Sequence, residues 1–159
     1  MTFAAQKEIF RMIPGLQNAE FARYGVMHKN AFLNAPEVLD KYSMLKVAPS
    51  NDKPFSGVFV AGQLSGVEGY VESAASGLLC GINAARLAAG KEPVVPGPGT
   101  MLGALMNYLA TASAKNFQPM NSNFGILAPL DIKRRDERYA AFAERSRRAI
   151  GEYKLKVES

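Results

Sequence analysis

Residues 57–86 read GVFVAGQLSGVEGYVESAASGLLCGINAAR, and this stretch decides the fold. It opens with an apolar run, residues 57–61, whose β-branched and aromatic side chains are typical of an inner strand of a parallel sheet. Gly62, Gly66 and Gly69 follow, and glycines let a main chain turn sharply and approach a ligand closely. The stretch therefore predicts a buried strand that ends in a glycine turn.

A helix is predicted after the turn, over residues 70–89. Its small residues recur three or four positions apart, at Ala74, Gly77, Gly81 and Ala85. Residues at this spacing share one face of a helix, so another backbone or a flat ring can approach that face closely. The amides at the start of such a helix attract anions or carbonyl oxygens.

Polar side chains cluster around this turn more densely than a purely structural loop requires. They are Gln63, Ser65, Glu68, Tyr70, Glu72 and Ser73. In open α/β sheets, ligands bind at the carboxyl ends of the strands, where this cluster is expected. The alternative is a strand, turn and helix without any ligand, since a fold does not determine a function.

Three motifs resemble one known family. They are GQLSGVEGYVESAASGLLCGINAA at 62–85, QKEIFRMIPGLQNAEFARYGVMHKN at 6–30 and NFQPMNSNFG at 116–125. Together they resemble the folate- and FAD-dependent tRNA (uracil-5-)-methyltransferases over nearly the whole chain. A sister family, the tRNA carboxymethylaminomethyl-uridine flavoenzymes, has a similar loop, but Val67-Glu68 and the third motif fit the methyltransferases better.

The resemblance implies an α/β fold class: the C-terminal part of a two-segment, glutathione-reductase-like FAD-binding fold with a helical C-terminal appendage. Residues 1–90 would belong to the FAD-binding domain, 91–100 to a linker and 101–159 to a helical region. Members of the family begin with a strand and a G-x-G-x-x-G turn, whereas residues 97–103 have the wrong spacing for one. We therefore expect a C-terminal third that is inactive without the N-terminal FAD-binding portion, its partner.

The reaction implied by the resemblance is methylation of uracil C5 in tRNA, with methylenetetrahydrofolate, reduced FAD and a nicotinamide cofactor (NADH or NADPH) as the source of electrons. The residues expected to bind FAD are Gly62, Gln63, Gly66, Val67, Glu68, Gly69, Tyr70 and Ser73. Two other interpretations stay open. One is a non-enzymatic RNA-binding or scaffold fragment, and the other is a fragment of the sister flavoenzyme.

Substrate-binding residues are expected in the other two motifs. Arg23, His28 and Asn30 would end a strand beside the FAD loop, where the arginine can pair with a folate carboxylate or an RNA phosphate. Asn121 and Asn123 can hydrogen-bond a base or a pterin, with neighbouring phenylalanines available for stacking. The alternatives are a structural histidine and a polar loop held by two buried aromatic residues.

Cys80 is the only cysteine, which rules out an internal disulfide and a multi-cysteine metal site within this sequence, and we expect no metal. It lies in the middle of the predicted helix among small residues, so a buried structural thiol is the favoured interpretation. The nucleophilic cysteines of the family are expected in its N-terminal portion.

The net charge of +5 and the isoelectric point near 9.4 favour a nucleic-acid partner. On a helical wheel, Arg134, Arg138, Arg145 and Arg148 fall within an arc of roughly 80°. Such a face can contact RNA phosphates, although exposed arginines on a solvated helix are ordinary. The sequence has neither a membrane-spanning run nor a leader pattern, so a cytoplasmic location is expected.

Other elements follow from local signals. We predict helices at residues 6–12 and 101–112, and a final helix that Asp131 caps and that reaches about Tyr153. Extended segments are predicted at 20–32 and 42–47.

Overall fold

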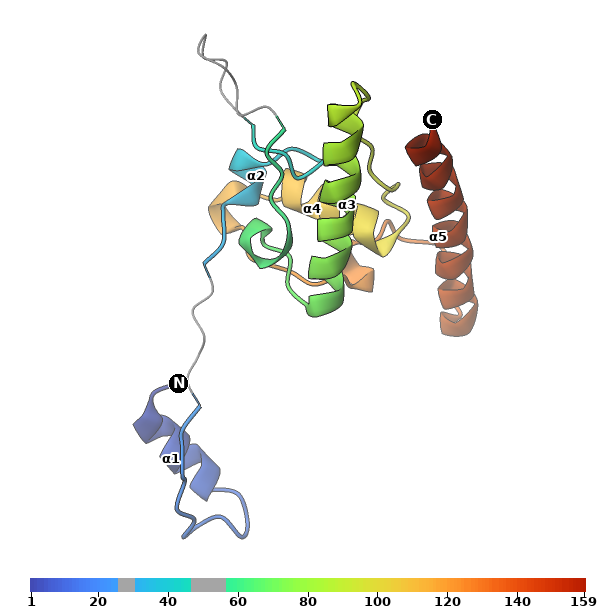
Figure 1. Cartoon of the computed structure of the whole chain (residues 1–159). Coiled ribbons are helices and arrows are strands. Elements are labelled where there is room, and N and C mark those ends of the chain that lie inside the picture. Colours follow the sequence, from blue (N-terminus) through green and yellow to red (C-terminus); the bar gives the residue numbers. More distant parts are fainter. Residues whose placement is uncertain (26–30, 47–56) are drawn as a thin grey trace. The chain divides into compact units, whose positions relative to one another are not determined.

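The computed structural model describes residues 1–25, 31–46 and 57–159 (Figure 1). By its internal contacts the chain divides into two compact units, residues 1–30 and residues 31–159. Each unit is described by itself below. Helices dominate both, and the β-structure of the described residues consists of three isolated bridges.

The first unit is built on helix α1, Phe3–Arg11. Buried Gln6 holds the returning chain, because its side-chain amide donates to the carbonyl of Gly25 and accepts from the amide of Gly25, both at 3.0 Å. The helix starts three residues earlier than predicted, since the side chain of Thr2 caps it. Its end before Pro14 agrees with the prediction.

The core of the second unit surrounds helix α4, Met101–Thr111. Leu105, Met106 and Leu109 are almost fully buried there, and α4 contacts helices α2 and α3 and the short helix η3. Thr100 caps α4 by accepting from the amide of Gly103 at 2.9 Å. The predicted helix at 101–112 is thus confirmed to within one residue.

Helix α3 spans Tyr70–Ala88 and confirms the predicted helix at 70–89 to within one residue. Buried Asn83 ties α3 to the segment that follows, because its side-chain oxygen accepts from the amide of Val94 at 2.8 Å. Residues 91–100 then run without regular structure into α4, and both helices belong to the same compact unit. The predicted division into a FAD-binding domain, a linker and a helical region stays a prediction.

The predicted strand at 57–61 has a different pairing from the one expected. Phe59 bridges Met44, and the two segments run antiparallel. Hydrogen bonds from Leu45 to Val58 and from Val60 to Ser43, both 2.9 Å, complete the pair. A sheet needs further strands beside this pair, and the described residues contain only isolated bridges. The expected α/β class is therefore not confirmed in the described part of the chain.

Helix α5 spans Arg135–Glu158, so it begins later and ends later than predicted. Asp131 does not cap it, and the residue at the cap position is Arg134. Asp136 and Glu137 stand in the first turn, where carboxylates are favourable near the helix N-terminus and can stabilise the start without a side-chain cap.

The remaining elements are short. They are α2 (Ala35–Val38), η1 (Gly62–Ser65), η2 (Ala114–Asn116) and η3 (Phe124–Ile126). Over the three described stretches, no helix has both the length and the apolar character that crossing a membrane requires.

Candidate functional site: the glycine turn at the start of helix α3

The glycine turn is anchored in the core at its centre and open at its end. The short helix η1 ends at Gly66, which has φ +88°, and Gly69 precedes α3 with φ +86°. Both values lie in the left-handed region that glycine adopts without strain. Between them, Val67 is fully buried in the core around α4. The core therefore fixes the position of the turn.

The amides of the first half of the turn are satisfied within the chain. The amide of Gly62 donates to the hydroxyl of Ser76 at 2.8 Å, and that of Gly66 donates to the carbonyl of Gln63 at 3.0 Å. The amide of Glu68 donates to Met120 at 2.9 Å. These three amides are already bonded, so they are not free to donate to a ligand.

The donors that remain lie at the start of α3. No side chain caps this helix, and among the hydrogen bonds of the described residues none is donated by the amides of Gly69, Tyr70 or Val71. Tyr70 is 97% exposed and Val71 is 80% exposed. A helix leaves its first amides without internal partners, so these groups are available to a hydrogen-bond acceptor outside the described fold.

The structure joins the turn to the motif at 116–125, which is distant in sequence. Val67 and Met120 form a parallel bridge, and the amide of Met120 donates to the carbonyl of Gly66 at 2.9 Å. Two residues on, the hydroxyl and the amide of Ser122 donate to the carboxylate of Glu72, at 2.7 and 3.3 Å. Two motifs of the predicted site are thus brought side by side.

Glu72 is held as an anion at the first turn of α3. The hydroxyl of Ser122 has the largest effect, and with the amides of Glu72 and Ser122 it holds the pKa of the Glu72 carboxyl below its usual range. The carboxylate is therefore charged at neutral pH. A negative charge here offsets part of the positive end of the helix dipole, so the free amides are better matched to a neutral carbonyl oxygen than to a phosphate.

The two asparagines of this motif differ from one another in their surroundings. The side-chain oxygen of Asn123 accepts from the amide of Gly125 at 2.8 Å, and its nitrogen donates to the carbonyl of Asn121 at 3.0 Å. The Asn123 side chain therefore shapes its own turn. Asn121 is exposed, next to Ser122. Of the two flanking aromatic residues, Phe117 is buried, whereas Phe124 is 49% exposed.

Of the three candidates in the first motif, only Arg23 lies in the described part of the chain. It is exposed and belongs to the unit at residues 1–30. His28 and Asn30 lie outside the described residues. Their expected position beside the turn stays a prediction.

The arginines of α5 have different surroundings. Arg134 pairs with Asp136 and Glu137, both at 2.8 Å, whereas Arg148 is exposed. Arg145 donates to the carbonyl of Ala128 at 2.9 Å and lies over the Phe142 ring, so it fastens α5 to the preceding loop. The sequence predicted that Arg145 faces RNA together with the other three arginines, whereas in the structure it also bonds within the chain.

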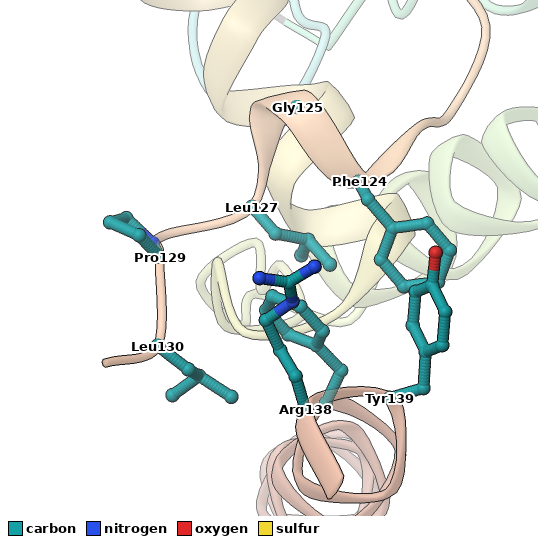
Figure 2. A pocket seen from close by; sticks show the side chains of 8 residues that line it. Phe124, Gly125, Leu127, Pro129, Leu130, Arg138 and Tyr139 are labelled. Atoms are coloured by element: carbon teal, nitrogen blue, oxygen red, sulfur yellow. The ribbon is translucent and has the colours of Figure 1, made fainter. Parts of the chain in front are cut away.

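Arg138 lines a cleft that sequence reasoning missed (Figure 2). The cleft lies between η3 and α5 and has a volume of about 510 Å³. Its walls are Phe124, Gly125, Leu127, Pro129, Leu130, Arg138, Tyr139 and Phe142. The apolar composition of residues 124–130, FGILAPL, was the available signal, but the pairing of this segment with α5 is not encoded locally.

Cys80 is buried, as predicted, and its thiol lies 3.9 Å from the carbonyl of Val60. Burial raises the pKa of the Cys80 thiol. The neutral thiol is a poor nucleophile, so this residue fills space between α3 and the segment at 57–61.

One face of α3 is open along its whole length. Tyr70, Val71 and Leu78 are exposed on it, and the small residues predicted to share a face, Ala74, Gly77, Gly81 and Ala85, lie among them. A Cβ added at Gly77 or Gly81 would meet nothing within 4 Å. Exposed apolar side chains gathered on one helix face are typical of a contact surface.

A core-anchored glycine turn that leads into an uncapped helix is an arrangement in which the first helical amides can donate to a ligand. The chain belongs to the family described as glucose inhibited division protein A, whose family model matches residues 1–92.

Similar proteins agree with this assignment and with the resemblance found in the sequence. The chain is 54% identical over 149 residues to the methylenetetrahydrofolate–tRNA-(uracil-5-)-methyltransferase TrmFO of Desulforudis audaxviator (strain MP104C), covering 92% of this chain and 32% of the relative. It is 52% identical over 152 residues to the protein of the same name from Bacillus cereus (strain AH187), covering 94% and 33%. The predicted membership of the folate- and FAD-dependent tRNA methyltransferases is confirmed, and the chain spans about a third of the length of these curated relatives.

Proposed function

We propose that the chain is the C-terminal portion of a flavoenzyme that methylates C5 of a tRNA uracil, and that its glycine turn holds the flavin end of FAD. The names of its relatives, methylenetetrahydrofolate–tRNA-(uracil-5-)-methyltransferase, supply the reaction. The observation that carries the proposal is the set of free amides at Gly69, Tyr70 and Val71 on a turn that the core fixes in place.

The residues of the turn fit the ring end of FAD better than its pyrophosphate. The free amides at the start of α3 can donate to a ring carbonyl, while ionised Glu72 disfavours a phosphate at the same position. Gly66 and Gly69 supply the positive φ angles that bring the chain from the core to the start of α3. A Cβ at Gly66 would meet the buried Phe117 ring and one at Gly69 would meet the Glu72 carboxylate, so these glycines shape the turn from inside the fold. FAD, when bound, supplies the redox chemistry of one-carbon transfer, and this chain supplies the binding and orientation.

The remaining residues of the proposed cofactor site surround these donors. Gln63, Glu68 and Tyr70 are exposed on the turn, and Ser73 lies beside Gly62 on the first turn of α3. Asn121 and Arg23 are the candidates for folate or uracil, with His28, Asn30 and Asn123 in the same motifs. NADH or NADPH as the electron source is part of the same proposal, as is a cytoplasmic location.

The open face of α3 is the proposed contact with the rest of the enzyme. The relatives are about three times as long as the region matched here, so their further residues can cover this face. Small residues along it allow close approach of a backbone, and burial of Tyr70, Val71 and Leu78 would stabilise the contact. The segment at 57–61 would gain further strand partners in the same way, which would complete an α/β FAD-binding fold.

Flavin content tests this proposal. We define the completed protein as this chain joined to the part of the Bacillus cereus relative outside the matched region. We expect the purified chain alone to be colourless, because half of the site is missing, and the completed protein to carry stoichiometric FAD by its absorbance. If the completed protein carries no flavin, the proposal that it is a flavoenzyme is wrong. If the chain alone carries stoichiometric FAD, the proposal that the FAD site needs residues outside this chain is wrong.

A second candidate function is a non-enzymatic RNA-binding module, which the basic residues and the cleft at α5 favour. It predicts salt-dependent tRNA binding by a completed protein that never retains flavin. A fragment of the sister carboxymethylaminomethyl-uridine flavoenzyme is the third, and the names of the relatives favour the methyltransferase over it.

A further inference from the structure

We infer that the cleft between η3 and α5 binds one unstacked nucleotide of a single-stranded RNA segment, with its base against Phe124 and Tyr139 and its phosphate at Arg138. The inference rests on the proposed function, because it takes RNA as the substrate. It adds a binding site in which a base stacks on aromatic rings inside a cleft. The sequence predicted only phosphate contacts by arginines along one face of the helix.

The aromatic residues of the cleft form an exposed platform. The rings of Phe124 and Tyr139 lie with centroids 4.9 Å apart and planes tilted by 52°, so a base that stacks on one ring meets the edge of the other. The centroids of Phe124 and Phe142 are 5.5 Å apart. Phe142 is buried and supports the other two, which are each more than a third exposed. Exposed aromatic rings on a buried support are how proteins stack the bases of single-stranded nucleic acids.

The charge of the cleft suits a phosphate. Arg138 is the only charged residue among those that line it, and Figure 2 shows its guanidinium extending from α5 toward Leu127. Among the described residues no acidic side chain forms an ion pair with it. Outside the cleft, Arg135 lies over the Tyr139 ring, 5.3 Å from its centroid. Two cations thus flank one aromatic platform.

The geometry favours RNA over free folate, which also combines a flat ring with an anion. The cleft is open to solvent along its side, so a longer chain can pass through it. Arg138 inside the cleft and Arg135 over the Tyr139 ring give a second cation for a neighbouring phosphate. Phe124 also follows directly on the segment at 120–122 that contacts α3. A strand of RNA in the cleft would therefore approach the proposed flavin site along this segment.

The experiment measures binding of a fluorescein-labelled octauridylate to this chain by anisotropy, with a labelled RNA duplex for comparison. Arg138→Gln and Phe124→Leu are each expected to weaken binding of the single strand about tenfold. Arg147→Gln makes the same charge change on an exposed part of α5 and is expected to have less than about a threefold effect. Circular dichroism checks that each variant is folded.

A second readout needs no substitution. Octauridylate carrying 4-thiouridine is irradiated with the wild-type chain, and we expect cross-links at Phe124 or Tyr139. Cross-links elsewhere only, or equal affinities of Arg138→Gln and Arg147→Gln, overturn the cleft as the site while RNA binding itself stands. Absence of any RNA binding overturns the inference too, and the proposed function is then judged by flavin content.

Two further outcomes also overturn the inference. Equal affinity for the duplex, unchanged in Phe124→Leu, would mean that no base is stacked. Competition by 5-formyltetrahydrofolate, lost in Arg138→Gln, would assign the cleft to the folate instead.

Discussion

Gly66→Ala is expected to destabilise the chain by about 3 kcal/mol, from a strained backbone and an overpacked ring together. Gly66 has φ +88°, which an alanine adopts only at a cost. The added Cβ would also lie 2.6 Å from Cζ of Phe117. That ring cannot move freely, because it is buried and packs against Tyr108 with centroids 5.9 Å apart. Urea unfolding of the purified chain measures the loss.

Gly90→Ala is the matched control for this change. Gly90 has φ +71°, but a Cβ there would meet nothing within 4 Å. It therefore carries the backbone cost alone, about 1 kcal/mol. If the two variants unfold at the same urea concentration, the contact between the turn and Phe117 does not hold the turn against the core, and the anchoring of the site is wrong.

Gly81→Leu is expected to leave the stability of the chain alone unchanged or higher and to lower the flavin content of the completed protein. A Cβ at Gly81 meets nothing within 4 Å, and leucine is the better helix former by up to about 1 kcal/mol, so the chain alone keeps or gains stability. In the completed protein the leucine would occupy the face that another backbone approaches. We expect FAD to bind at least about fivefold more weakly, with the flavin content of the purified protein reduced accordingly, since overpacking costs about 1–3 kcal/mol.

Gly151→Leu provides the comparison. Gly151 lies on α5, where an added Cβ also meets nothing within 4 Å, and it is outside the open face of α3. The completed protein with this change should keep its flavin. Normal flavin content in Gly81→Leu would show that the open face of α3 is not a contact surface.

Local sequence signals predicted the helices but not the pairings between segments. The helix at 70–89 follows from the spacing of its small residues after a glycine turn, and the helix at 101–112 from its apolar composition, which are properties of neighbouring residues. The antiparallel bridge of Phe59 to Met44 and the contact of Val67 with Met120 join residues far apart in sequence. No local rule selects such partners, so the expected parallel pairing was wrong at Phe59.

The site was predicted in outline for the same reason. Glycines at 62, 66 and 69 marked the turn, because their conformational freedom can be read from residue type alone. Residue type does not show that Ser76 and Met120 already accept hydrogen bonds from amides of the turn, because both partners come from other segments. The cleft at α5 depends on packing between η3 and α5. The sequence suggested that Asp131 caps this helix, whereas the helix starts at Arg135.

Hydrogen–deuterium exchange of the completed protein, with and without FAD, is the most direct test of the claim that the glycine turn holds the flavin. The amides of Gly69, Tyr70 and Val71 have no acceptor among the described residues, so they should exchange fast without FAD and be protected when it binds. Unchanged fast exchange at these three amides in a protein that carries stoichiometric FAD would contradict the account.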